Sequence, residues 1–286
     1  MKQIFNIIIC IFIPYLVALG GSANGFEVNN IPIIFNCLLI AFGIQFLVFI
    51  PSYIFKTERF FDLTGSIAFL SMMAYIVYIR SFENLNYTGL ILVFLISIWT
   101  LRLGLFLFLR IHKDGSDRRF DKLKIDFLKF LVTWMLQGFW VFVTASCAVA
   151  VLCSETIIDY TPTIIVGLSI WIIGFLIEVI ADIQKRRFRK NNKGQFISSG
   201  LWAYSRHPNY LGEILLWFGI SIICFSNLES SQYITLISPV FIYLLLTRIS
   251  GVNLLEEYAD KKWGNLDAYK EYKNITPVLF PIKKNN

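Results

Sequence analysis

Long apolar runs separated by short polar connections dominate the chain. Most runs reach the roughly 20 residues with which an α-helix crosses about 30 Å of hydrocarbon, and they lack the alternation of membrane β-strands. The pattern predicts an all-α, polytopic membrane helix bundle with about eight transmembrane helices. The expected segments are approximately 4–20, 31–55, 64–79, 88–109, 127–153, 162–181, 210–226 and 232–250.

Composition favours a membrane protein over a soluble one. Hydrophobic residues make up 56% of the chain and charged residues 16%, below the roughly 25% charged residues of soluble domains. One globular core cannot bury that much apolar surface, so the chain needs a bilayer as solvent. The cysteines lie in apolar runs, and neither a clustered His/Cys pattern nor a glycine-rich phosphate loop occurs. We therefore expect no metal, no soluble-type nucleotide fold and no nucleic-acid partner.

Positive charge collects in three connections, near 110–126, near 182–209 and after Gly251. With eight crossings all three fall on one side of the membrane, which the positive-inside rule makes the cytosolic side. Both termini are then cytosolic, in a bacterial inner membrane or an endoplasmic reticulum. In a second interpretation, Met1-Lys2 and the first apolar run form a signal peptide that ends near Gly21. Its cleavage would leave seven helices in the same orientation.

Ionisable residues inside the apolar runs are candidates for function, because a charge in hydrocarbon is costly. The five candidates lie toward the cytosolic ends of the helices. Snorkelling of a long side chain to the interface explains Arg248 well but does not explain carboxylates. The five are Arg102, Glu178, Asp182, Glu213 and Arg248.

The sixth run continues out of the membrane as a charged helix. Glu178, Asp182, Arg186 and Arg189 follow one another at i, i+4, i+8 and i+11, which places them on one face. Arginines suit bidentate phosphate binding, and the acids can accept hydrogen bonds from hydroxyl or amide groups. The alternative for the arginines is a basic cluster that only orients the helix.

The segment from Gly200 to Glu213 is the densest polar cluster of the chain. Gly200 and Ser205 to Pro208 predict a tight return into the membrane, with Pro208 at the first helical position. Asn209, Glu213 and Trp217 then share a face, and Gly212 would admit a neighbouring backbone or a flat ring. A helix N-terminus here offers free N–H groups to an anionic or polar ligand.

The fourth run ends in a further group of charges. Arg102 and Arg110 share a face that climbs toward the cytosol. The following loop, Asp117-Arg118-Arg119-Phe120, is either functional or an ordinary solvated charge run.

These motifs resemble those of the steroid 5-alpha-reductase-like proteins, and most closely the DUF1295 group within them. The resemblance covers roughly residues 60–281, and it is specific at superfamily level without fixing a substrate. It rests on Ser205-Arg-His-Pro-Asn-Tyr-Leu-Gly-Glu213, Trp99-Thr-Leu-Arg102-Leu-Gly104, Asp117-Arg-Arg-Phe120, Gly174-Phe175 with Glu178, Ala181-Asp182 and Gln184, and a tail from Glu256-Glu257 through Tyr269 and Tyr272 to Phe280-Pro281.

The resemblance implies an enzyme that binds NADPH at the cytosolic side of its helix bundle. Asn209 and Glu213 correspond to residues beside the nicotinamide, and Trp99 stands where the reductases have a carbonyl-polarising Tyr. Glu213, Tyr210 and Asp62 are the expected catalytic residues, with Asp62 as the candidate for the family's early acid. The expected cofactor-binding residues are Arg102, Glu178, Asp182, Arg186, Arg189, Tyr204, Arg206, His207, Asn209 and Glu213.

The leading hypothesis is an NADPH-dependent reductase of a carbon–carbon double bond in a lipophilic, steroid-, isoprenoid- or fatty-enone-like substrate. Residues 1–60 would form N-terminal transmembrane helices, and residues 61–286 the catalytic membrane domain. The alternative is a methyltransferase that uses S-adenosylmethionine and is similar to isoprenylcysteine carboxyl methyltransferase. A transporter or lipid-binding scaffold ranks third. The substrate and the oligomeric state stay open.

Overall fold

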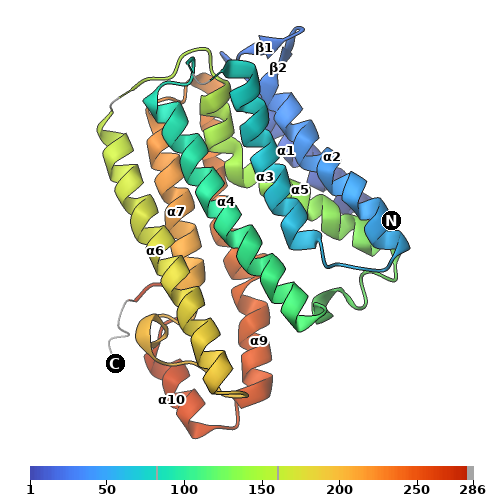
Figure 1. Ribbon diagram of the computed structural model, residues 1–286, viewed down its shortest axis with the longest axis vertical. Coiled ribbons are helices and arrows are strands. Elements are labelled where there is room, and N and C mark those ends of the chain that lie inside the picture. Colours follow the sequence, from blue (N-terminus) through green and yellow to red (C-terminus); the bar gives the residue numbers. More distant parts are fainter. Residues whose placement is uncertain (82, 160, 282–286) are drawn as a thin grey trace. The chain divides into compact units, whose positions relative to one another are not determined.

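The computed structural model describes residues 1–81, 83–159 and 161–281. Within these ranges, eight helical segments are long and apolar enough to cross a membrane, which confirms the predicted all-α bundle and its number of spans (Figure 1). The first seven are α1 (Lys2–Gly21), α2 (Ile33–Ile54), α3 (Phe61–Arg80), α4 (Tyr87–Asp114), α5 (Phe127–Cys153), α6 (Pro162–Asn191) and α7 (Pro208–Phe225).

The eighth segment, Ser230–Trp263, is composite. It contains the 3₁₀ helix η3 (Ser230–Leu236), α8 (Ile237–Leu244), the π-helical η4 (Leu245–Ile249) and α9 (Val252–Trp263). The remaining elements are the antiparallel hairpin β1 (Glu27–Val28) and β2 (Ile31–Pro32), the 3₁₀ turns η1 (Arg118–Phe120) and η2 (Gly200–Ala203), and α10 (Asp267–Ile275).

Local side-chain chemistry sets several helix boundaries. The Asn86 side chain precedes α4 and accepts a hydrogen bond from Gly89 N at 3.2 Å, and Asp126 caps α5 by accepting from Lys129 N at 3.1 Å. Such caps satisfy amides that have no partner inside the helix. Gly115 ends α4 with φ at 82°, a conformation that glycine adopts without strain.

The first compact unit comprises Met1–Ile164 and Cys224–Ser238, and α5 is its most buried helix. Within the spanning window, 83% of α5 is buried, against 28–39% for α1 to α4. Protein therefore surrounds α5, whereas the other four turn much of their apolar surface outward. Aromatic edges pack at one end of this core, where the Trp134 ring lies 5.2 Å from Phe61 and 5.9 Å from Phe130.

The second compact unit comprises Ile165–Ile223 and the described residues 239–281, and glycines bring its helices α6 and α7 together. A Cβ on Gly212 would lie 2.6 Å from the backbone O of Gly174 and from Glu178 N. A Cβ on Gly219 would lie 2.6 Å from Gly167 O. The expected close approach at Gly212 is therefore to another backbone.

The division between the two units falls inside α6, α7 and α8 and not in a linker. Accordingly, no glycine- or serine-rich stretch in the sequence marks the boundary between the units. The division at residue 60 into N-terminal helices and a catalytic domain stays a prediction.

Candidate functional site

One face of α6 carries both acids and both arginines of the predicted stripe. The helix is unbroken over Pro162–Asn191, so Glu178, Asp182, Arg186 and Arg189 keep their helical register. The two carboxylate residues are buried, with 2% and 8% of their surface exposed, whereas both arginines are exposed. The face therefore passes from a dry acidic half to a solvent-facing basic half.

Helix α7 begins at Pro208, the first helical position that the sequence predicts for it. Glu213 is buried and Asn209, one turn earlier, is half-buried. Gly212, which directly precedes Glu213, lies against the backbone of Glu178 on α6. The structure thus brings the buried acids of α6 into one region of the second unit with residues 205–213, the segment called the signature below.

The turn η2 is held against α6 by contacts with Ala181, Gln184 and Lys185. Trp202 Nε1 donates to Ala181 O at 3.1 Å, and Leu201 N donates to the Gln184 side chain at 3.0 Å. Lys185 Nζ lies 4.4 Å from the centre of the Trp202 ring, a cation–π contact. Gly200 opens the turn with φ at 64°. These contacts fix the start of the signature on the same stretch of α6 that carries the candidate cofactor residues.

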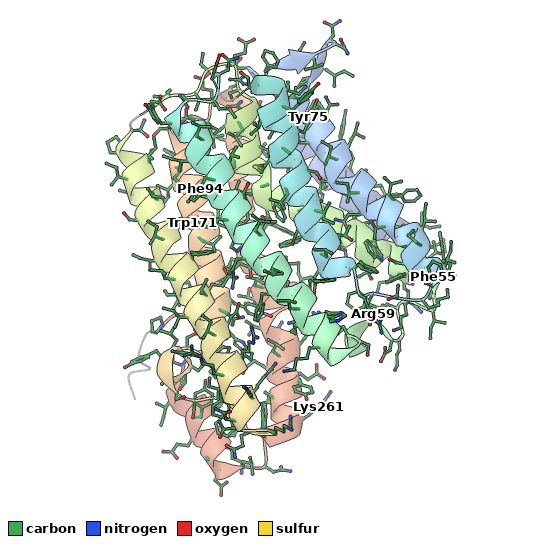
Figure 2. The ribbon with its side chains drawn as sticks, in the orientation of Figure 1. Phe55, Arg59, Tyr75, Phe94, Trp171 and Lys261 are labelled. Carbon is green, nitrogen blue, oxygen red and sulfur yellow. The ribbon has the colours of Figure 1, made fainter. Side chains whose placement is uncertain are left out.

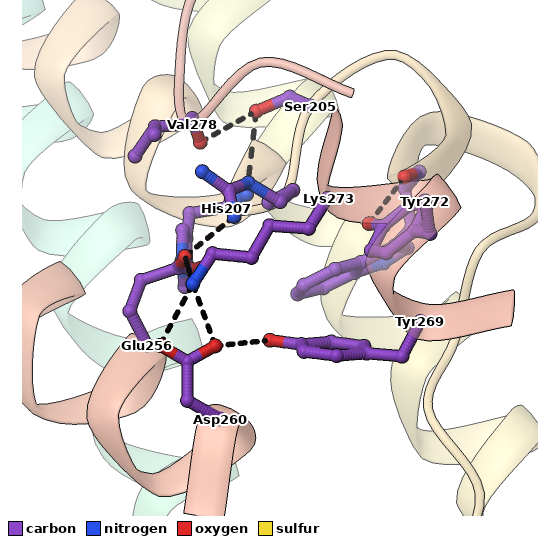
Figure 3. Close-up of polar contacts among 10 residues, drawn as sticks. Ser205, His207, Glu256, Asp260, Tyr269, Tyr272, Lys273 and Val278 are labelled. Atoms are coloured by element: carbon purple, nitrogen blue, oxygen red, sulfur yellow. Dashed lines mark hydrogen bonds and ion pairs between the residues drawn. The ribbon is translucent and has the colours of Figure 1, made fainter. Parts of the chain in front are cut away.

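Glu256 on α9 binds both the arginine and the histidine of the signature. Its Oε2 lies 2.6 Å from Arg206 Nη1, and its Oε1 lies 2.8 Å from His207 Nε2 (Figure 3). The ion pair with Arg206 and the hydrogen bond with His207 hold both side chains against one carboxylate. Ser205 Oγ accepts from His207 N at 3.3 Å and so steadies the turn before α7.

The C-terminal tail closes over the same loop. Tyr272 Oη donates to Trp202 O at 2.7 Å, and Arg206 N donates to Pro277 O at 3.0 Å. Lys273 Nζ lies 2.6 Å from Asp260, which also accepts from Tyr269 Oη at 3.4 Å (Figure 3). The tail therefore helps to position the signature.

Burial and the nearby carboxylates determine which of these groups carry protons. Burial, followed by the charges of Glu256 and Asp260, raises the pKa of Tyr269 to about 12, so its hydroxyl remains a donor. Burial lowers the pKa of His207, although the Glu256 carboxylate acts in the opposite direction. The ring is then neutral at pH 7, and its proton lies on Nε2, which faces the carboxylate.

His207 Nδ1 is consequently an acceptor. It is buried and has no hydrogen-bond partner among the residues that the structure describes. A ligand hydroxyl or amide N–H would satisfy it. Buried acceptors next to exposed arginines match the hydroxyl, amide and phosphate groups of a dinucleotide, so the residues present fit NADPH.

The remaining predicted site residues have less specific surroundings. Tyr204 is exposed, and Tyr210 stacks on His207 with ring centres 5.8 Å apart. Asp62 and Arg102 belong to the first unit, where Asp62 forms an ion pair of 3.6 Å with Arg110. Their predicted roles stay predictions.

The sequence pattern did not predict the contacts of two carboxylates, Glu256 and Glu58. Glu256 was visible only as part of the resembling tail, and nothing in its local pattern points to Arg206 and His207. Glu58 is an isolated acid before α3, yet it is buried and accepts from Asp117 N at 2.9 Å. Arg119 Nε in turn lies 2.9 Å from Asp117 Oδ2. The Asp117–Phe120 segment is therefore built into the fold and is not a freely solvated charge run.

The family model described as "Protein of unknown function (DUF1295)" matches residues 48–276. The chain belongs to the DUF1295 family. Its motifs and its eight candidate spans agree with this membership, and the protein is an integral, multi-pass membrane protein.

Two curated relatives are sterol reductases by name. The DUF1295 chain is 26% identical over 167 residues to the Delta(14)-sterol reductase of Arabidopsis thaliana, covering 53% of the chain and 39% of that relative. It is 28% identical over 127 residues to a probable 7-dehydrocholesterol reductase of Acanthamoeba polyphaga mimivirus, covering 38% and 27%. The matches thus span less than half the length of either relative. No solved structure matches the chain.

Proposed function

We propose that the protein is a membrane reductase that uses NADPH to reduce a carbon–carbon double bond in a lipophilic substrate. The similarity to two sterol reductases carries this proposal, because it selects one chemistry among those that a membrane helix bundle can host. The site in the second unit supports it independently through the chemistry of its donors and acceptors.

Different residues of the chain would bind different parts of NADPH. Arg186 and Arg189 would bind phosphate oxygens, and Asp182 and Glu178 would accept hydrogen bonds from hydroxyl groups in the dry half of the face. His207 Nδ1 and Asn209 would orient the bound group further. When bound, NADPH supplies a hydride to one carbon of the double bond.

The neighbouring carbon must receive a proton. Glu213 is the proposed donor or relay, since a carboxyl group in a dry site can hold and release a proton. Tyr210, stacked on His207, and Asp62 in the first unit are further proposed proton-handling groups. Arg102 keeps its proposed role in cofactor binding.

The proposed orientation places both termini and the cofactor site in the cytosol. The basic connections around 110–126 and 182–209 support it, because positive charge remains on the cytosolic side. NADPH would then reach the site from the cytosol while the substrate stays in the bilayer.

Transfer of a deuteride tests the proposed reaction. Protein in lipid nanodiscs is incubated with NADPH deuterated at the transferable position and, in turn, with a conjugated sterol diene, an isoprenoid enone and a fatty enone. The expected product carries one deuterium from NADPH and one proton from solvent. Methyl transfer from S-adenosylmethionine to a lipid acceptor in the same nanodiscs would count against the proposal.

A further inference from the structure

A polar pocket of about 300 Å³ lies in the first unit, where the chain leaves α2 and enters α3. Its walls come from residues 55–59, the turn at Gly115 and Ser116, and Lys124. Figure 2 marks this end of the unit by Phe55 and Arg59. None of these residues has a role in the proposed reduction.

Hydrogen bonds hold the three walls together. The buried Glu58 accepts from Asp117 N at 2.9 Å and from Lys124 Nζ at 2.8 Å. Arg59 Nε donates to Gly115 O at 3.2 Å, across the pocket walls. The pocket is therefore a feature of the folded loops and not a gap between independent side chains.

The pocket has an excess of positive charge. Lys56, Arg59 and Lys124 line it together with a single carboxylate, that of Glu58. Burial opposes ionisation of Glu58, but the Lys124 and Asp117 hydrogen bonds outweigh it and lower the pKa of that carboxyl. The hydrogen bond to Glu58 raises the pKa of Lys124, so these two neutralise each other. The Lys56 ammonium lies 3.3 Å from the centre of the Tyr53 ring, a cation–π contact that leaves its charge unneutralised. The charges of Lys56 and Arg59 are therefore the ones that attract an anion.

The lining also offers hydrogen-bonding groups of the right kind. The Thr57 and Ser116 hydroxyls can donate to anionic oxygens, and the guanidinium of Arg59 retains N–H donors beside the one used by Gly115 O. The α4 carbonyl end would repel an anion, but Arg59 already binds its terminal Gly115 carbonyl. Tetrahedral oxyanions, and phosphate above all, match such a set.

The position of the pocket selects the source of the phosphate. Helix α2 ends at Ile54, and the next residue, Phe55, is 77% exposed and also lines the pocket. A large apolar side chain beside cations at the end of a membrane span suits a ligand with acyl chains and a charged headgroup. We propose that this pocket binds the phosphate of an anionic phospholipid headgroup.

Native mass spectrometry of the purified full chain tests the proposal. Phosphatidylglycerol is titrated into wild type and into the double variant Lys56→Gln/Arg59→Gln. The matched control is Lys122→Gln/Lys129→Gln, which removes the same charge from nearby positions outside the pocket. We expect the affinity for phosphatidylglycerol to fall about tenfold or more in the pocket variant and to stay unchanged in the control. Equal melting temperatures verify that all three proteins are folded.

Two further arms identify the ligand. Phosphatidylcholine with the same acyl chains should bind more weakly, and its affinity should be the same for wild type and for the pocket variant. Glycerol 3-phosphate carries an anionic phosphate ester without acyl chains and should bind far more weakly than the lipid. Equal binding of glycerol 3-phosphate and phosphatidylglycerol would overturn the lipid assignment in favour of a soluble phosphate ester.

Equal losses in the pocket and control variants would overturn the site itself. NADPH binding should be the same in all variants, which separates this test from that of the reductase.

Discussion

Glu213 is the residue on which the proposed chemistry depends most. It is buried on α7, one turn after Asn209 and next to the glycine that contacts Glu178. Glu213→Gln keeps the size of the side chain and removes its acid. We expect turnover to fall by about 10²–10⁴-fold while NADPH affinity is largely retained, because a proton relay is lost and a hydrogen-bonding group is kept. Single-turnover oxidation and a binding titration measure the two effects.

The matched control for this variant is Glu257→Gln. Glu257 is exposed and pairs only with Lys261, one helical turn away, among the described contacts. The control should behave as wild type in both assays. Full activity of Glu213→Gln would remove the residue from the reaction.

His207 predicts how stability depends on pH. Burial lowers its folded-state pKa below the ordinary value near 6.5, so below that pH the unfolded chain binds more protons than the folded one. The contribution of His207 is therefore fully present above about pH 6.5 and is lost as pH falls toward the lower, folded-state pKa. Melting temperatures in detergent between pH 8 and pH 5 should decline accordingly.

A His207→Gln variant separates this effect from other titrations. It can still donate to Glu256 but has no charge change in this range, so its pH dependence should be flatter than that of wild type. Identical slopes in the two proteins would assign the effect to another group.

At the scale of elements, the packing of α6 on α7 depends on glycine. An alanine methyl at Gly212 would lie 2.6 Å from two backbone atoms of α6, so Gly212→Ala forces the helices apart. We expect a loss of about 1–3 kcal/mol in stability, the usual effect of overpacking a core. Gly43→Ala in α2 is the matched control, because no atom lies within 4 Å of its new Cβ.

The control should even gain stability, by up to about 1 kcal/mol, since alanine favours the helical conformation. Unfolding midpoints in one detergent compare the two variants. A Gly212→Ala protein as stable as Gly43→Ala would mean that α6 and α7 are not in close contact at this point.

The elements themselves were largely predictable from the sequence. Hydrophobic run length gave all eight spans, and Pro208 gave the start of α7. Spacing along one helix also placed Glu178, Asp182, Arg186 and Arg189 on a common face. Run length and helical spacing depend only on residues close together in the sequence, so a single stretch of chain is enough to predict them.

Contacts between distant segments were not predictable in the same way. Glu256 lies 49 positions beyond His207, and Glu58 lies 59 positions before Asp117. No periodicity links a single acid in one loop to a partner in another. The eighth span likewise departs from the α-helix expected over 232–250, because η3 and η4 interrupt it.

At the scale of the whole molecule, the chain is a DUF1295 membrane protein with two compact units. Apolar composition predicted the membrane protein, and the resemblance of its motifs predicted the family. The boundary between the units was hidden, because it crosses α6, α7 and α8 where the apolar pattern is continuous.

The central claim is that the site in the second unit binds NADPH. Titration of the purified protein with NADPH and, separately, with S-adenosylmethionine tests it most directly, with calorimetry as the readout. We predict saturable binding of NADPH, weakened roughly ten- to a hundredfold by Arg186→Ala or Arg189→Ala, since each removes a charged contact to phosphate. S-adenosylmethionine should not bind. Saturable binding of S-adenosylmethionine with none of NADPH would contradict the account.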